Sequence, residues 1–290
     1  DSRGVRVGGR GLVTRTETMT VNMGPQHPST HGVLRLVLEL DGETIVGAEP
    51  TIGFLHTGIE KTAEQKKWQQ VIPLVERMDY LGAQSNSLSF CLSAEKLLGL
   101  EMPDRVTYIR VLIAELQRLN SHLVWLATHA MEIGAISVMM YAFREREQLL
   151  NLNEMIAGFR LFPSYIRIGG LREDLPRDYK KAVKELLDKM PAAIDNYELM
   201  LTKNQVWTKR TKGVAVLSKE LTLGLGLVGP MARAVGINYD VRRMWPYLKY
   251  ETFDFVVPTR TDGDVFARYQ VKVEEMRQSV RICQQALERI

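Results

Sequence analysis

The sequence has 290 residues, 45% hydrophobic and 25% charged, with a formal net charge of +4, a composition typical of a soluble globular protein of one or two domains. Its basic residues are scattered among acidic ones, which argues against nucleic acid as a partner, and no apolar run reaches the ~18 residues that cross a bilayer. Only two cysteines occur, Cys91 and Cys283, and they form no CxxC pair, so neither a disulfide framework nor a zinc site is indicated.

The chain begins with residues 1–18, a segment rich in glycine and arginine that is typical of a flexible arm. The next distinctive stretch is GPQHPSTHG at 24–32, which carries His27 and His31 four positions apart. Four-residue spacing on a helix suits a shared metal, but Pro28 rules out a regular helix there. The stretch is therefore predicted to be an extended or turned loop.

A β-hairpin is predicted next. Residues 33–40, VLRLVLEL, carry leucine at every second position, as a half-buried strand does. Asp41-Gly42 is a strong hairpin signal, and ETIVGAEP at 43–50 is the expected return strand. With Asp41 and Gly42 as the two turn residues, position 33 faces position 50.

This register also brings three histidines to one end of the hairpin. Extended backwards, it places His27 near His56, with His31 close by. A metal shared by the three is a minor alternative, because no ligand spacing supports it. We expect His27 and His56 to be mainly structural.

Beyond the hairpin, apolar residues recur at helical spacing in several long segments. These segments cover residues 78–98, 104–133, 137–158, 178–201 and 264–290. The intervening stretch 202–263 is broken by glycine, proline and aromatic residues and is predicted to form loops and short helices. The expected fold is α+β, with a small N-terminal antiparallel β domain at 19–60 and a mainly helical domain at 61–290.

The segment 104–133 has the clearest helical pattern, with Asp104 behind Pro103 as the expected N-cap and Gly134 as its expected end. An apolar stripe predicts the core-facing side: Leu112, Leu116, Leu119, Leu123, Leu126, Ala130 and Ile133. A second stripe consists of Glu115, Arg118, His122, Trp125, His129 and Glu132. Because the second stripe lacks lysine, it favours a buried interhelical hydrogen-bond network, with a functional pocket as the alternative.

Three further motifs are, by themselves, weak evidence for a functional site. GLGLVG at 224–229 matches the dinucleotide fingerprint, but Pro230 follows it and no βαβ unit surrounds it, which disfavours nicotinamide binding. VERMDYLGA at 75–83 is typical of a capped helix start, and YAFRERE at 141–147 is typical of a salt-bridged helix face.

Several stretches become informative when they are taken together: GPQHPSTHGVLRL, IGFLHTGIEK, RMDYLGA, YAFRERE and YIRIGGLREDLP. In this order and approximate spacing they resemble the D-subunit family of respiratory complex I, which is the 49-kDa-type family of the proton-pumping NADH:quinone oxidoreductase. The resemblance runs from about residue 19 to the end and implies a family that continues past residue 290. It also implies kinship with the large subunits of nickel-iron hydrogenases, whose metal-holding cysteine pairs this sequence lacks.

The resemblance implies a quinone site with three catalytic residues. His31 and Tyr80 resemble the pair that hydrogen-bonds the quinone headgroup, and imidazole and phenol suit this role because each quinone carbonyl needs a donor as charge develops on it. Glu132 matches the acid that pairs with that histidine, where the family usually has aspartate. A carboxylate there favours the imidazolium form.

Other positions have supporting roles by the same resemblance. Thr128 and His27 would line the quinone pocket, and Asp79 would support it. Arg77 resembles the arginine near the terminal iron-sulfur cluster, where a fixed positive charge favours the reduced state. Phe162 stands where the family commonly has a histidine near that cluster, so the cluster's potential is expected to depend less on pH.

The implied activity is electron transfer from the terminal [4Fe-4S] cluster of the neighbouring B-type subunit to quinone, coupled to proton translocation. This chain itself would hold no metal or cofactor, and NADH and FMN would bind distant partner subunits. The expected partners are the B, C, H and I subunits of the complex. The expected location is peripheral, on the cytoplasmic side of the bacterial inner membrane or on the matrix side in mitochondria.

Two alternatives remain open at this point. One is the large subunit of an energy-converting hydrogenase or of a ferredoxin-fed relative, which nickel in the purified chain or the identity of the input subunits would reveal. The other is a scaffold that keeps the fold without turnover. The presence of both His31 and Tyr80 weighs against the scaffold.

Overall fold

The structure, a computed structural model, describes residues 17–290, so the arm predicted at 1–18 lies almost entirely outside the described residues. The chain divides into two compact units, with the boundary between Gly58 and Ile59. The first contains a small antiparallel sheet and the second is mainly helical. The predicted α+β fold class is confirmed.

The first unit is built on a three-stranded antiparallel sheet. Its strands, in the spatial order β1-β2-β3, are β1 (Met19–Met23), β2 (Arg35–Asp41) and β3 (Thr44–Thr51). The β2–β3 hairpin confirms the prediction from alternating leucines. Strand β1 was not predicted, because its five residues, MTVNM, are too few to show a clear alternation.

The hairpin register differs from the prediction. Asp41 is still paired within β2, so the turn consists of Gly42, at φ +61°, and Glu43. A bulge in β3, where Val46 is the extra residue opposite Glu39 and Leu40, then shifts the pairing once more, and Leu36 rather than position 33 faces Pro50. The predicted register was therefore wrong, because the hairpin signal did not reveal a turn one residue later or the extra bulge residue.

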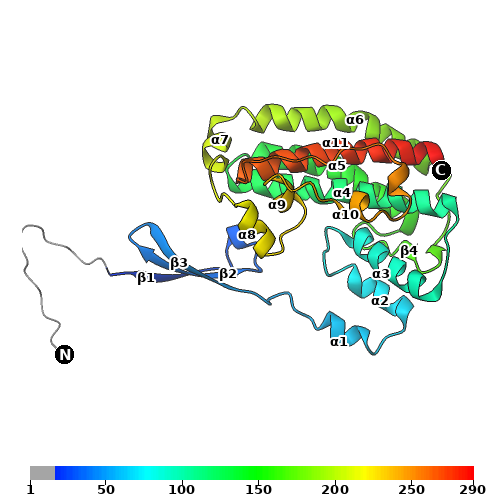
Figure 1. Cartoon of the computed structure of the whole chain (residues 1–290), viewed down its shortest axis with the longest axis horizontal. Coiled ribbons are helices and arrows are strands. Elements are labelled where there is room, and N and C mark those ends of the chain that lie inside the picture. Colours follow the sequence, from blue (N-terminus) through cyan, green and yellow to red (C-terminus); the bar gives the residue numbers. More distant parts are fainter. Residues whose placement is uncertain (1–16) are drawn as a thin grey trace, which may run out of the picture. The chain divides into compact units, whose positions relative to one another are not determined.

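The second unit is built mainly from long helices. They are α3 (Ala83–Leu98), α4 (Asp104–Glu132), α5 (Ile136–Ala157), α6 (Tyr179–Leu201) and α11 (Val265–Arg289). Figure 1 shows α4, α5, α6 and α11 running side by side, with α4 packed on α5 and α11, and α6 packed on α5 and α11. These helices confirm the predicted segments, except that the first begins at Ala83 and not at residue 78.

Short elements fill the remaining connections. They are η1 (Pro28–Thr30), α1 (Ile59–Ala63), α2 (Trp68–Val75), β4 (Ile166–Arg167), β5 (Gly170–Leu171), α7 (Gln205–Thr211), α8 (Lys219–Gly224), α9 (Pro230–Arg233), α10 (Val241–Met244) and η2 (Tyr250–Thr252). The stretch 202–263 thus forms the predicted loops and short helices. GLGLVG begins at Gly224, the last residue of helix α8, and does not follow a strand, so the context of a dinucleotide fingerprint is missing from the described chain. Among residues 17–290, none of the helices combines the length and hydrophobicity that crossing a bilayer requires.

Helix α4 supplies the centre of the core. Its predicted apolar stripe is buried from Leu112 to Ala130. Pro103, rather than Asp104, is the N-cap, and Asp104 is the first helical residue. Gly134, at φ +100°, lies just beyond the helix and ends it as predicted.

A buried arginine joins three parts of the helical unit. Arg110 of α4 donates to both carboxylate oxygens of Glu95 in α3, at 2.8 and 2.6 Å. It also donates to the main-chain carbonyls of Arg167 and Gly170, which belong to β4 and β5. Because both charges are buried, each depends on the other, and the pair fixes α3, α4 and the β4–β5 hairpin together.

The charged stretch YAFRERE lies on α5. Arg144 pairs with Glu145 at 2.6 Å, and Glu147 pairs with Arg160 at 2.6 Å. Glu145 is largely buried and also accepts a hydrogen bond from the hydroxyl of Tyr197 in α6, at 2.8 Å. The predicted salt-bridged helix face is confirmed.

The two cysteines lie on different helices. Cys91 of α3 and Cys283 of α11 are both buried, and neither forms a disulfide within the described chain. Burial raises the pKa of Cys91 to about 12 and raises that of Cys283 well above its ordinary value. Both behave as packing residues, and they offer no thiolate pair for a nickel-iron centre.

Candidate functional site

The residues between α2 and α3 form a tight turn that carries Tyr80. The carboxylate of Asp79 accepts hydrogen bonds from the main-chain N–H groups of Leu81 and Gly82, at 3.0 and 3.2 Å. A Cβ added at Gly82 would lie 2.7 Å from Asp79 Oδ2, so this close approach favours glycine. Tyr80 therefore projects from a turn, with 53% of its surface exposed, and not from a long helix as predicted.

Two amide side chains tie this turn to the helical core. Asn86 of α3 donates through Nδ2 to the carbonyls of Val75 and Asp79, at 2.9 and 3.2 Å. Gln117 of α4 donates through Nε2 to the carbonyl of Leu81, at 2.5 Å. The backbone around Tyr80 is thus positioned by two long helices.

Arg77 lies at the beginning of the same turn. Its Nη1 donates to the carbonyl of Pro73 at 2.6 Å, and its Cζ lies 4.5 Å from the ring centroid of Phe162. These residues line a surface pocket of about 500 Å³ together with Arg167 and Arg172. Three arginines beside aromatic rings favour an anionic partner at this surface.

Glu76 immediately precedes Arg77, and it was not singled out in the sequence as a functional residue. It is fully buried at the end of α2. Its carboxylate accepts hydrogen bonds from Ser87 Oγ at 3.0 Å, and from Ser164 N and Ser164 Oγ at 2.7 Å each. One sequence signal could have drawn notice to it, because an acid at a helix C-terminus is disfavoured by the helix dipole and needs compensating donors.

The histidine loop lies in the sheet unit, between β1 and β2. His27 Nδ1 accepts a hydrogen bond from Ser29 N at 3.1 Å and thereby caps η1. Thr30 is buried, and its hydroxyl lies 3.1 and 3.0 Å from the carbonyls of Pro25 and His27. His31 follows at φ +54° with an exposed side chain. The predicted turned loop is confirmed.

The three histidines of this unit do not make a metal centre. Within residues 17–290, no group of three or more His, Cys, Asp or Glu side chains is arranged to hold a metal ion. The register that placed His27 near His56 was wrong, because β2 begins only at Arg35 and the preceding residues turn through η1. His27 instead uses its ring nitrogen to cap a turn.

Thr128 and Glu132 lie near the end of α4. The Thr128 hydroxyl is bonded to its own helix, 3.0 and 3.2 Å from the carbonyls of Val124 and Trp125. Glu132 is the last helical residue and is exposed. Of the two, Glu132 is therefore the one that presents a polar group at the surface.

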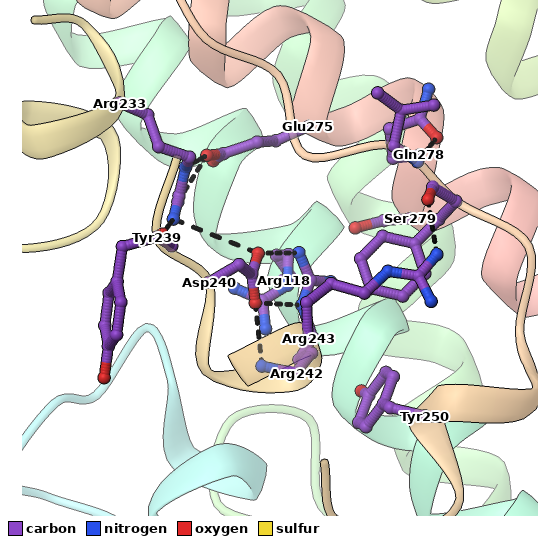
Figure 2. A network of polar contacts seen from close by, with 12 residues as sticks. Arg118, Arg233, Tyr239, Asp240, Arg242, Arg243, Tyr250, Glu275, Gln278 and Ser279 are labelled. Atoms are coloured by element: carbon purple, nitrogen blue, oxygen red, sulfur yellow. Dashed lines mark hydrogen bonds and ion pairs between the residues drawn. The ribbon is translucent and has the colours of Figure 1, made fainter. Parts of the chain in front are cut away.

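The second stripe of α4 enters a buried polar network, part of which is drawn in Figure 2. Glu115 accepts hydrogen bonds from Arg242, Tyr250 and Ser279, at 2.9, 2.7 and 2.7 Å, and Arg118 lies 3.2 Å from it. Burial would raise the pKa of Glu115, but the charges of Arg118 and Arg242 hold it well below its usual range. The predicted interhelical network is confirmed for this part of the stripe.

A second part of the network contains groups that titrate. Glu275 of α11 accepts hydrogen bonds from Arg233, at 2.8 and 2.5 Å, and from His122 Nε2, at 2.7 Å (Figure 2 shows the Arg233 bonds). Burial would raise the pKa of Glu275, but His122 and Arg233 bring it down to about 2. Lys272 lies 4.3 Å from the ring centroid of Trp125, and burial lowers its pKa to about 8. Glu275 is therefore ionised at neutral pH, whereas the lowered pKa of Lys272 lies about one unit above neutral pH.

The predicted site residues fall into separate groups. The turn between α2 and α3 brings together Arg77, Asp79 and Tyr80, whereas the other two predicted residues of the helical unit lie at the end of α4. Both predicted histidines belong to the sheet unit. The pairing of His31 with Tyr80 stays a prediction.

The sequence is similar to a known group of respiratory proteins. A family model described as the 49 kDa subunit of respiratory-chain NADH dehydrogenase matches residues 132–290. The D 1 subunit of NADH-quinone oxidoreductase from Solibacter usitatus is 58% identical over 270 residues, which cover 93% of this chain and 66% of that protein. The D 2 subunit from Roseiflexus sp. is 54% identical over 279 residues, which cover 96% and 67%. The chain belongs to the 49 kDa subunit family.

A third relative gives the same result. The D 2 subunit from Chloroflexus aurantiacus is 55% identical over 276 residues, which cover 95% of this chain and 67% of that protein. The chain thus spans about two thirds of the length of the curated relatives it matches. The family match at 132–290 includes Glu132, Phe162 and all of α11, and the resemblance expected from the motifs is confirmed.

Proposed function

We propose that this chain is the quinone-binding core subunit of a complex I type NADH:quinone oxidoreductase. In this proposal, electrons pass from the terminal [4Fe-4S] cluster of the adjacent B-type subunit to quinone, and the complex couples this reaction to proton translocation. NADH and FMN bind distant subunits. Membership of the 49 kDa subunit family supports the proposal, as do the names of the relatives, which are NADH-quinone oxidoreductase subunits.

The observation that carries the proposal is the fixed turn that presents Tyr80 close in sequence to Arg77. The Tyr80 side chain is 53% exposed, while the backbone on either side is held by Asp79, Asn86 and Gln117. A quinone carbonyl needs a hydrogen-bond donor as negative charge develops on its oxygen, and a phenol supplies one. Because the backbone is already fixed, little reorganisation is needed when the reaction occurs.

His31 is the proposed second donor. Reduction of a quinone to a quinol consumes two electrons and two protons, so each carbonyl oxygen becomes a hydroxyl. The imidazolium of His31 would donate to one carbonyl while the phenol donates to the other. Glu132 would favour the protonated form of His31 and help to restore its proton after transfer. Thr128 and His27 would line the pocket, and Asp79 would hold the turn.

The arginine pocket is the proposed surface toward the B-type subunit. Arg77, Arg167 and Arg172 line it, and their positive charge would favour an anionic iron-sulfur cluster, above all in its reduced state. The B, C, H and I subunits of the complex are the proposed partners. The proposed position is peripheral, on the cytoplasmic side of a bacterial inner membrane or on the matrix side in mitochondria.

The test replaces the two proposed donors in the assembled complex. Tyr80→Phe removes one oxygen and His31→Ala removes the imidazole, so each is expected to slow quinone reduction by roughly 10²-fold or more. NADH oxidation with an artificial dye should stay normal in both, since the dye takes electrons before the quinone site. Tyr141→Phe, at another exposed tyrosine, is the matched control and should be neutral. Normal quinone reduction in both site variants would show that the site assignment is wrong.

A further inference from the structure

Glu76 and Arg77 are neighbours in the chain, and both contact the loop that contains Phe162 and Ser164. We infer that Glu76 is a positioning residue, which holds this loop so that the ring of Phe162 stays against the guanidinium of Arg77. The inference rests on the proposed function, because its effect is read at the cluster that Arg77 is proposed to face.

The carboxylate of Glu76 is buried and accepts hydrogen bonds from specific neighbouring groups. It is fully buried, and burying a carboxylate is costly unless hydrogen bonds satisfy it. Its three donors are neutral groups, the hydroxyl of Ser87 and the N–H and hydroxyl of Ser164. Two of the three come from a residue 88 positions away, so most of the compensation for burial depends on the loop being in place.

Ser164 also depends on Glu76. Its φ is +41°, in the left-handed region that a residue with a Cβ adopts at a cost. The two bonds from Ser164 to Glu76, each 2.7 Å, oppose the relaxation of this strained backbone. Phe162 lies only two residues earlier, so its ring position is set from this anchor.

The contact that Glu76 would maintain is the one between Arg77 and Phe162. Arg77 Cζ lies 4.5 Å from the ring centroid, and Arg77 Nη1 is bonded to the carbonyl of Pro73 at 2.6 Å. The backbone of Arg77 follows Glu76 directly, while Phe162 precedes Ser164. One carboxylate therefore secures both sides of the cation–π contact, and without it the guanidinium loses its aromatic support.

The direction in which the midpoint potential of the cluster changes distinguishes a positioning role of Glu76 from a direct effect of its negative charge. If Glu76 acted only through its own negative charge, Glu76→Ala would raise the midpoint potential of a nearby cluster. If it acts by holding Arg77 in place, the same variant displaces a positive charge and lowers that potential. Glu76→Gln removes the charge but keeps one oxygen acceptor, and its amide can donate to the Ser164 hydroxyl.

The experiment measures the midpoint potential of the terminal cluster in the assembled complex, with dye reduction by NADH as the check on assembly. The variants are Glu76→Ala, Glu76→Gln, Arg77→Ala and the double variant Glu76→Ala with Arg77→Ala. The matched control is Glu145→Ala. Glu145 of α5 is also buried and accepts a hydrogen bond, from Tyr197 of α6, but it does not line the arginine pocket.

We expect Arg77→Ala to lower the potential and Glu76→Ala to produce at least half of that fall. The double variant should show no further fall beyond Arg77→Ala, and both Glu76→Gln and Glu145→Ala should show none. If Glu76→Ala prevents assembly, Ser164→Ala serves instead. It removes one of the two Ser164 bonds, so a smaller fall supports the inference and an unchanged potential overturns it.

Two results overturn the positioning role while leaving the proposed function intact. In one, Arg77→Ala lowers the potential but Glu76→Ala leaves it unchanged or raises it. In the other, Glu76→Ala lowers it equally with and without Arg77. If Arg77→Ala itself has no effect, the cluster-facing role of Arg77 fails, and the inference fails with it.

Discussion

Lys272 on α11 lies where its own charge is unfavourable. Burial lowers its pKa to about 8, and Glu275 offsets this only in part. In an unfolded chain a lysine titrates near its ordinary pKa of about 10.4, so the unfolded state binds this proton more tightly. Lys272 therefore destabilises the fold fully below about pH 8, and stability is regained as the pH rises from there toward the unfolded pKa.

Lys272→Met is expected to raise the free energy of unfolding at pH 7 by about 1–3 kcal/mol, because it removes the buried charge and keeps the aliphatic stem. The lost cation–π contact with Trp125 limits the gain. Urea denaturation at pH 7 and pH 9.5 measures the effect, which should shrink at the higher pH. Lys184→Met, at an exposed lysine of α6, is the control and should change little. A Lys272→Met variant less stable than the parent at pH 7 would contradict this account.

Phe162 offers a second test at single-residue scale. A phenyl ring has no titratable proton, so the potential of the cluster that is proposed to lie near Phe162 is expected to vary little with pH. Phe162→His should introduce a slope of up to about 59 mV per pH unit, because reduction of the cluster would favour protonation of the imidazole. Potentiometric titration of the assembled complex between pH 6 and 8 measures this slope. Phe162→Tyr is the control that does not titrate in this range, and a full slope in the parent protein would refute the expectation.

At the scale of elements, α4 is held to α3 and to the β4–β5 hairpin by one buried arginine. Arg110 and Glu95 have side-chain exposures of 0% and 4%, so neither charge is compensated by water. The same helix carries Arg105, which pairs with Asp174 at the surface, 47% and 67% exposed. The two pairs therefore differ chiefly in burial, and this difference sets their expected contributions.

Arg110→Met should lower the free energy of unfolding by about 3–5 kcal/mol, because Glu95 is left charged and buried without its partner. The double variant Arg110→Met with Glu95→Met should recover much of this loss. Arg105→Met, at the exposed pair, should cost less than about 1 kcal/mol. Urea denaturation curves of the three variants provide the comparison, and equal losses for Arg110→Met and Arg105→Met would show that burial does not govern the pair.

Sequence patterns predicted the elements better than their ends. Helical spacing placed the long helices, and a stripe on α4 without lysine indicated the network around Glu115. The same spacing extended the first long helix back to residue 78, because it could not show that Asp79 bonds to the N–H groups of Leu81 and Gly82 and so competes with the helix.

The contacts that sequence could not predict are long-range. The bonds from Ser164 to Glu76 span 88 residues, and no local pattern links the two positions. The hairpin register failed for two local reasons, because the turn lies one residue later than predicted and an extra residue in a bulge shifts the pairs beyond it. The site residues came from motif resemblance, which identifies positions but not the contacts around them.

At the scale of the whole molecule, the two units bury very different amounts of apolar surface. The main core of the helical unit draws its residues from between Ile72 and Ala286. Within residues 17–58, Leu38 is the only buried hydrophobic side chain. Because a small sheet needs a covered hydrophobic face to be stable in isolation, the helical unit should be the autonomous one.

A fragment of residues 59–290 is therefore expected to fold cooperatively without the sheet. Its far-UV circular dichroism should be that of a helical protein, and thermal unfolding should give one transition. A fragment of residues 17–58 should show no cooperative transition under the same conditions. Gradual melting of the 59–290 fragment would mean that its core depends on the first unit.

The buried thiols on α3 and α11 can report local opening of the helical unit at two positions. Because it is the thiolate that attacks an alkylating reagent, and both Cys91 and Cys283 are buried with strongly raised pKa values, neither should react while the helices stay packed. Each becomes reactive only when its own helix separates from the rest. Their relative labelling rates would thus reveal which side of the bundle opens first, without adding any foreign probe to the protein.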